Sequence, residues 1–220
     1  MEFILLILAV ILAVFFGWLL KQSFNTSPWV ADAVSETAHE APLGANAKTI
    51  ALTVLMAVMT SFFALVMSAY AERMELGDWV PLSEPALLWA NTGILVVASF
   101  AFQWTRQAAV NDRVARLLPG MVLTGLLSFA FLAGQLLAWR QLAADGLTLS
   151  GNPANAFFYF LTAAHGLHLL GGLVVWAVAT ARLVAGHGTV KVRRSIELCA
   201  VYWHFLLIVW LVIFGYLLST

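Results

Sequence analysis

Charge is scarce in this 220-residue sequence. Asp, Glu, Lys and Arg make up 10% of the residues, whereas soluble proteins usually carry about 25%. Hydrophobic residues make up 62%, and the mean hydropathy is +0.92. So few charges could not keep a 24.0 kDa globule in water, and we infer that the chain is largely surrounded by lipid. The formal net charge is zero, so the composition gives no reason to expect nucleic acid as a partner.

Cysteine is almost absent, since Cys199 is the single one. One thiol excludes an internal disulfide and a cysteine metal site. Cys199 lies within an apolar run, where a small buried hydrophobe is the default interpretation. The sequence also lacks an evident internal repeat, a glycine-rich phosphate loop and a helix carrying a series of Asp, Glu and His such as a proton relay would use.

What the sequence does contain is a series of uncharged stretches. A transmembrane helix needs about 20 mostly apolar residues. Six stretches approach or exceed that length: Phe3–Leu20, Thr49–Ala71, Pro85–Thr105, Leu117–Trp139, Gly146–Ala181 and Leu198–Thr220. The fifth is too long for one span, and Asn152-Pro153 predicts that its helix starts near Ala154.

The first stretch is short enough to be compared with a cleaved signal peptide. Signal peptides carry a positive segment before their apolar run. Here Glu2 precedes the run and Lys21 follows it, which is the opposite polarity. We therefore interpret Phe3–Leu20 as a retained transmembrane helix.

The basic residues alternate between the loops. Nine of them fall on one predicted side, namely Lys21, Lys48, Arg106, Arg113, Arg116, Arg182, Lys191, Arg193 and Arg194. Arg73 and Arg140 fall on the other. The positive-inside rule places the nine in the cytoplasm, so both termini are expected on the outer side of a bacterial inner membrane.

Together these patterns predict an all-α membrane protein of six transmembrane helices. Residues 1–20 form an N-terminal helix, residues 21–48 a polar cytoplasmic linker and residues 49–220 a five-helix bundle.

Ionisable residues inside a membrane span are costly and need an explanation. His165 and His168 are three residues apart and share one side of the fifth span. His168 is roughly 21 Å from Arg182 along the helix, and His204 of the last span is roughly 15 Å from Arg194, so both lie near mid-membrane. The two spans are consecutive, and the three imidazoles are expected to meet between them. Glu197 lies seven residues before His204 on the same face.

Two interpretations of these histidines remain open. Imidazole is a good ligand for iron, copper and zinc, which allows a haem or metal site. Alternatively, the histidines form hydrogen bonds that hold two helices together, or they contact a lipid headgroup. Gly166, Gly171 and Gly172 flank them and predict close helix packing, which favours the structural interpretation. Asn91, Gln103 and Gln135 are likewise expected to form hydrogen bonds between helices.

Two sequence runs resemble a known family. Phe157–Gly172 (FFYFLTAAHGLHLLGG) is similar to the H-G-x-H-x-x-x-G stretch of cytochrome c oxidase subunit III. Glu197–Trp210 (ELCAVYWHFLLIVW) is similar to that family's last helix, where a glutamate precedes Y-W-H-F and a tryptophan. Asp78–Asn91 resembles compact bacterial members, which have five helices. The resemblance covers about Lys48–Thr220, and residues 1–47 are expected to lie outside it.

The resemblance implies roles for individual residues. In the family, certain positions pack helices together or contact bound phospholipid. The residues of this chain that stand at such positions are His165, His168, Glu197, Tyr202, Trp203, His204 and Trp210. Two positions depart from the family. The family's first core helix usually contains Ser-Glu, but Val54–Tyr70 contains no acid, and Leu207 stands where the last helix often has Asp.

The function implied by the resemblance is that of an accessory subunit of a haem–copper respiratory oxidase. Subunits I and II would hold the haem and copper, with cytochrome c as donor, while this chain would hold phospholipid and no redox centre of its own. A subunit III-like component of a nitric oxide reductase or a quinol oxidase is an alternative. A b-type cytochrome or metal carrier using the three histidines is an alternative of another class, and a small transporter is a third.

Overall fold

The structure is a computed structural model that describes residues 47–81, 85–149, 151–186 and 189–219. The chain divides into two units, residues 1–44 and residues 45–220, and the described residues belong to the second. The predicted helix Phe3–Leu20 and nearly all of the predicted linker 21–48 lie outside the described residues. The prediction of a sixth, N-terminal span therefore stays a prediction.

The described part of the chain contains five helices long and apolar enough to cross a membrane. They are α2 (Ala47–Met74), α3 (Leu87–Val110), α4 (Leu117–Ala144), α5 (Pro153–Val184) and α6 (Thr189–Leu218). A short 3₁₀ turn, Val114–Arg116, precedes α4. All five correspond to predicted spans, which confirms an all-helical, multi-pass membrane protein.

Most of these helices extend beyond the apolar stretches that predicted them. Arg106 lies inside α3 and Arg140 inside α4, although both were assigned to loops. The predicted start of the last span, Leu198, is wrong by nine residues, because α6 begins at Thr189 and includes Arg193 and Arg194. The fifth helix begins as expected, with Pro153 in its first turn and the side chain of Asn152 accepting a hydrogen bond from the Ala154 N–H at 3.2 Å.

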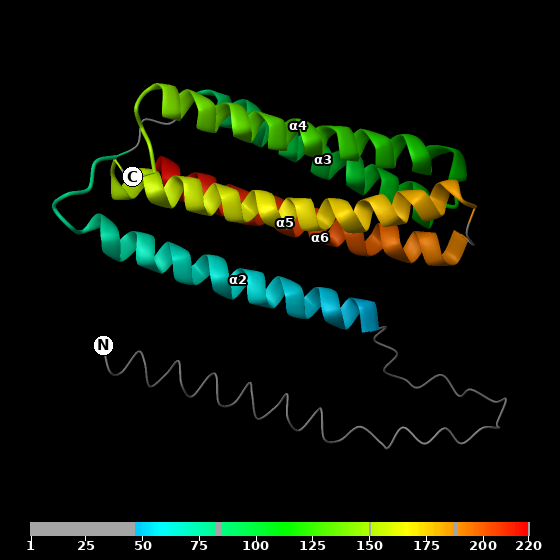
Figure 1. The fold of residues 1–220 in the computed structure, drawn as a ribbon. Coiled ribbons are helices and arrows are strands. Elements are labelled where there is room, and N and C mark those ends of the chain that lie inside the picture. The colour runs from blue at the N-terminus through cyan, green and yellow to red at the C-terminus, as the bar shows by residue number, and fades with distance from the viewer. Residues whose placement is uncertain (1–46, 82–84, 150, 187–188, 220) are drawn as a thin grey trace, which may run out of the picture. The chain divides into compact units, whose positions relative to one another are not determined.

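The body of the bundle is formed by α3, α4, α5 and α6, which are labelled in Figure 1. α3 packs against α4 and α6, and α5 packs against α4 and α6, which closes a ring of four neighbours. Among the described elements, α2 contacts only α5 and α6. Most of its side chains are exposed, so α2 lies on the outside of the ring. A groove, which we call the groove along α2, lies where the first turns of α2 meet α5 and α6.

Four tryptophan side chains tie the ring together through their indole N–H groups, each at 3.0 Å from its acceptor. Trp139 donates to Thr162 and Trp176 to the Met121 carbonyl. The other two start from α6: Trp203 donates to Ser128 and Trp210 to Thr92. A buried indole N–H without an acceptor would be costly in lipid, so each bond fixes which helix the tryptophan faces.

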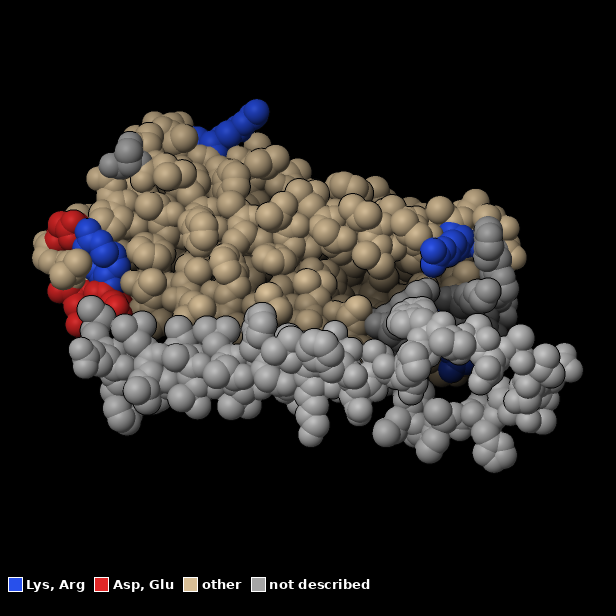
Figure 2. All heavy atoms as spheres, turned by 60° about the horizontal axis from the view of Figure 1, so that its bottom comes forward, with Lys and Arg blue, Asp and Glu red and all other residues tan. Residues whose placement is uncertain are grey.

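Among the described residues, charged side chains lie toward the ends of the helices and in the connections between them. Figure 2 shows long uncharged flanks, with acidic side chains at one end. Many large apolar side chains on α2 to α6 are more than one-third exposed, which is the pattern expected of a surface that contacts lipid or another membrane protein.

Candidate functional site

The candidate site consists of the three intramembrane histidines and the aromatic residues of α6. His165 is fully buried in the ring. Its Nε2–H donates to the Leu206 carbonyl of α6 at 3.1 Å, and its ring lies 5.0 Å from that of Trp210 and 5.6 Å from that of Phe131. His165 thus joins α5 to α6 and contacts α4.

His168 has different neighbours, although it lies only three residues further along α5. Its Nδ1–H donates to the Ala164 carbonyl of its own helix at 2.7 Å. Its ring lies 5.6 Å from Phe63 and 6.3 Å from Phe62, both on α2. His168 is half-buried and borders the groove along α2.

His204 faces a third direction, toward α3. Its Nε2–H donates to Gln103 Oε1 at 3.1 Å, and its Nδ1 accepts from the Ser99 hydroxyl. The structure therefore does not bring the three imidazoles together between α5 and α6 as the sequence led us to expect. They point toward three different helices, and no group of three or more His, Cys, Asp or Glu side chains gathers anywhere in the described ranges.

Glu197 lies on the first half of α6 and forms an ion pair one turn back in the same helix. The Nε of Arg193 is 3.2 Å from Glu197 Oε1. Both side chains are partly exposed, so this pair is a weak contribution to stability, as are most exposed i,i+4 pairs.

Three buried aromatic residues of α6 have separate surroundings. Tyr202 donates its hydroxyl to the His168 carbonyl at 3.0 Å, and it approaches Met59 of α2. Trp203 packs against Phe102 at 5.0 Å, and Trp210 packs against Phe131 at the same distance. Tyr202 and Trp203 also line the groove, whereas Trp210 lies inside the ring.

The groove itself is an apolar cavity of about 610 Å³ between α2, α5 and α6. Aliphatic side chains such as Leu55, Leu167 and Val174 make up most of its wall. Arg182, near the end of α5, and Ser195 of α6 are among its few polar lining residues. Cys199 also borders it and is buried, which agrees with its interpretation as a small hydrophobe.

The flanking glycines do not all serve close packing. A Cβ added at Gly172 would lie 2.7 Å from Cε1 of Tyr202, so the missing side chain lets α5 approach α6. At Gly171 nothing lies within 4 Å, because that residue opens into the groove. At Gly166 only Leu132 is near, at an ordinary 3.7 Å. The prediction of close packing is thus confirmed for Gly172 alone.

Several hydroxyl residues form hydrogen bonds between helices, although the sequence did not single them out for this role. Ser99, Thr92, Ser128 and Thr162 each bond a histidine or tryptophan of another helix. No local signal distinguishes these hydroxyls from others that bond only their own helix. The expected hydrogen bonds of Asn91, Gln103 and Gln135 between helices are present.

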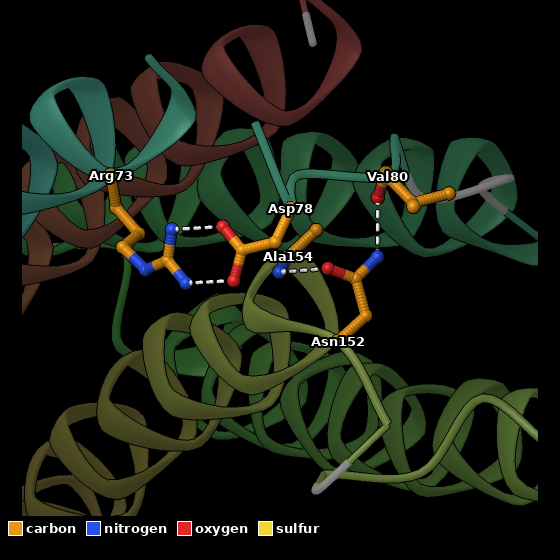
Figure 3. Close-up of polar contacts among 5 residues, drawn as sticks. All are labelled: Arg73, Asp78, Val80, Asn152 and Ala154. Carbon is orange, nitrogen blue, oxygen red and sulfur yellow. Dashed lines mark hydrogen bonds and ion pairs between the residues drawn. The ribbon is translucent and has the colours of Figure 1, made fainter. Parts of the chain in front are cut away.

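The loops at one end of the bundle are fastened to each other, as Figure 3 shows. Arg73, at the end of α2, forms two hydrogen bonds of 2.6 and 2.5 Å with the Asp78 carboxylate. These bonds hold the pKa of Asp78 below its usual value. The Asn152 amide, which caps α5, donates to the Val80 carbonyl at 2.5 Å and so joins the α2–α3 connection to the start of α5.

The fold and these contacts define a multi-pass helical membrane protein whose intramembrane polar groups connect helices. Comparison with known proteins adds a family. The sequence profile of the family "Cytochrome c oxidase subunit III" matches residues 3–218. The match begins within residues 1–47, so the expectation that this segment lies outside the resemblance is wrong.

Individual relatives carry the same description. A "Probable cytochrome c oxidase subunit 3" of Mycobacterium leprae is 30% identical over 173 residues, which cover 77% of this chain and 86% of the relative. One of Nocardia farcinica is 31% identical over 161 residues, covering 70% and 78%. The "Cytochrome c oxidase subunit 3" of Pongo abelii is 27% identical over 159 residues, covering 70% and 60%.

The chain therefore belongs to the cytochrome c oxidase subunit III family. Membership assigns it to the subunits of haem–copper respiratory oxidases, which are oxidoreductase complexes. It does not favour a b-type cytochrome, a metal carrier or a transporter.

Proposed function

We propose that this chain is an accessory subunit that braces the haem-bearing subunit I and holds phospholipid, while subunits I and II carry out electron transfer from cytochrome c to oxygen. One observation supports the accessory role most directly. The three intramembrane histidines, His165, His168 and His204, are of the residue type best suited to hold haem or copper, and they form hydrogen bonds or aromatic contacts with three different helices.

The groove along α2 supports the lipid part of the proposal. Its apolar walls suit acyl chains, and the guanidinium of Arg182 borders it near the end of α5, where it can pair with a phosphate. Of the seven residues that the family resemblance selects, His168, Tyr202 and Trp203 border this groove. We assign the other four, His165, Glu197, His204 and Trp210, to helix packing instead.

The proposed topology follows from charge. Arg113, Arg116 and Arg182 lie at the α3–α4 and α5–α6 end of the bundle, while Arg73 lies at the other. The positive-inside rule places the first end in the cytoplasm of a bacterial inner membrane and the C-terminus outside. With the predicted helix Phe3–Leu20, the N-terminus would also be outside, residues 21–48 would be a cytoplasmic linker and residues 49–220 would form the core.

A matched pair of substitutions tests the lipid role. Val174 lines the groove and is 65% exposed, and Leu126 of α4 is 63% exposed but lies outside it. Val174→Trp should fill part of the groove, and Leu126→Trp should not. We expect the oxidase complex with Val174→Trp to retain less phospholipid and to lose activity sooner during turnover, from an unchanged initial rate.

The control complex with Leu126→Trp should match the wild type in phospholipid content and durability. Equal phospholipid content in all three complexes would refute the groove as the lipid site. A reduced initial rate in the Val174→Trp complex with a normal haem spectrum would show instead that the groove takes part in the chemistry.

A further inference from the structure

One face of the bundle carries polar side chains that its own residues do not satisfy. We call it the α3–α6 seam, made of Phe100, Gln103 and Arg106 on α3 and of Val201, His204 and Ile208 on α6. Gln103, Arg106 and His204 are half-buried, while Phe100 and Ile208 are 69% and 60% exposed. None of these seam residues lines the groove along α2.

Hydrogen-bond donors exceed acceptors in the seam. His204 is satisfied, since it bonds Ser99 and Gln103 Oε1. The side-chain oxygen of Gln103 is used in this bond, but no described residue accepts a hydrogen bond from its side-chain nitrogen. The guanidinium of Arg106 also has no acceptor in the described part of the chain, and its Nε is buried. The seam therefore offers a cation and an amide donor and lacks an anion or carbonyl to match them.

The depth of these groups distinguishes two kinds of acceptor. α3 has 24 residues, so it is about 36 Å long and extends about 3 Å beyond each side of a hydrocarbon layer about 30 Å thick. Arg106 lies about 6 Å from the end of α3, where a long side chain reaches the headgroups. Gln103 lies about 10 Å from that end, which is too deep for a short amide to reach a phosphate. A lipid headgroup would satisfy Arg106 and leave Gln103 unpaired.

We propose that the α3–α6 seam is the surface that docks on a transmembrane helix of another oxidase subunit, and that this helix presents a carboxylate or another side-chain acceptor toward Arg106 and Gln103. Polar and ionisable groups at membrane depth are normally covered by protein and paired. Phe100 and Ile208 flank the polar groups on the two helices and would supply the apolar contacts around them. The inference rests on the proposed function, because it needs a partner subunit in the membrane.

Photo-crosslinking in the assembled complex tests the seam. A photoreactive amino acid replaces Phe100 or Ile208 in the seam, and Leu126 of α4 as an equally exposed control. We expect both seam positions to give adducts with another subunit in yields several-fold above that of the control. The adduct should map to a helix that carries an acidic or amide side chain.

Charge reversal gives an independent readout. Arg106→Glu should reduce the amount of this subunit retained by the complex in detergent, while Arg106→Lys should retain it better, since a cation is kept. Arg113→Glu makes the same charge change outside the seam, in the connection after α3, and should have no such effect. Equal losses for Arg106→Glu and Arg113→Glu would overturn the assignment.

The crosslinks also separate this inference from the proposed function. Adducts of Phe100 and Ile208 with phospholipid alone, or with residues 1–46 of the same chain, would overturn the docking surface, and so would crosslinks to the partner from Leu126 only. If the wild-type chain joined no haem-bearing subunit at all, the proposed function would fail as well.

Discussion

Two adjacent glycines on α5 allow helix packing to be measured separately from helix propensity. A Cβ at Gly172 would lie 2.7 and 3.1 Å from two ring carbons of Tyr202 and 3.2 Å from Cζ3 of Trp203, whereas nothing lies within 4 Å of a Cβ at Gly171. Both rings are buried, and the Tyr202 hydroxyl is held by the His168 carbonyl at 3.0 Å. We therefore expect an added Cβ at Gly172 to push α5 away from α6.

The magnitude follows from comparing Gly172→Ala with Gly171→Ala. Both gain the same helix propensity, at most about 1 kcal/mol, so this gain cancels in the comparison. Overpacking a well-filled contact costs about 1–3 kcal/mol. Gly172→Ala should therefore be less stable than Gly171→Ala by about 1–3 kcal/mol, which is roughly a 5- to 150-fold change in the unfolding equilibrium.

The assay is unfolding of the purified chain in detergent micelles by titration with a denaturing detergent, followed by tryptophan fluorescence. Gly171→Ala should unfold at or slightly above the wild-type midpoint, and Gly172→Ala below it. A difference between the two variants smaller than about 0.5 kcal/mol, well under the overpacking cost, would refute the packing of α5 against α6 described above.

Three further predictions concern single side chains, and a fourth concerns the membrane topology. His204→Ala should lower the free energy of unfolding by about 1 kcal/mol, since hydrogen bonds between membrane helices are weak, and an assembled complex that lost its initial rate would contradict the accessory role. Glu197→Ala removes a partly exposed pair worth roughly 0.5 kcal/mol or less, so equilibrium unfolding should barely change. Because the pKa of Asp78 is lowered in the folded state, its ion pair with Arg73 stabilises the protein at pH values above the usual carboxylate pKa, and this stability is lost as the pH falls through the folded pKa. Asp78→Asn should therefore flatten that part of an acid-unfolding profile. An unchanged profile would contradict the role of this ion pair. Reporter fusions at Thr220 and within Ser23–Ala47 should lie on opposite sides of the membrane, and a result on the same side would exclude the six-span topology.

The lengths of the uncharged stretches predicted the five described spans, but they did not predict where each helix begins and ends. A hydropathy pattern ends where the first charge appears, whereas a helix ends where its backbone hydrogen bonds end. The first turns of α6 contain Arg193 and Arg194 and remain helical, partly because Arg193 pairs with Glu197 one turn later. The start of α5 was predictable because Asn152 and Pro153 determine it through a side-chain cap and a fixed backbone angle.

The candidate residues were found from the sequence, but their surroundings were not. Residues three apart on a helix differ by about 60° around its axis, and this rotation is enough to turn His165 toward α6 and His168 toward α2. His204 pairs with Gln103, which lies 101 positions earlier, so only the packing of α6 against α3 reveals the contact. The groove along α2 depends in the same way on how that helix packs.

α2 packs less closely against the bundle than the other described helices do. Among the described elements it touches only α5 and α6, so the contacts within the ring of α3, α4, α5 and α6 do not include it. Polar side-chain contacts tie α2 to α6: Arg194 donates to the Thr49 hydroxyl at 2.8 Å, and the Tyr202 hydroxyl lies 3.7 Å from Met59 Sδ. Phospholipid bound in the groove would touch Ala51, Leu52 and Leu55 of α2 together with α5 and α6, and would so add contacts between α2 and the ring.

The location of the haem tests the central claim most directly. The tagged chain is purified from its native membrane, the co-purifying subunits are identified by mass spectrometry, and visible spectra are recorded before and after this chain is detached. The accessory role predicts that the complex contains a large haem-bearing subunit and that the entire Soret absorbance stays with it. A Soret band or stoichiometric copper in the detached chain would contradict the account.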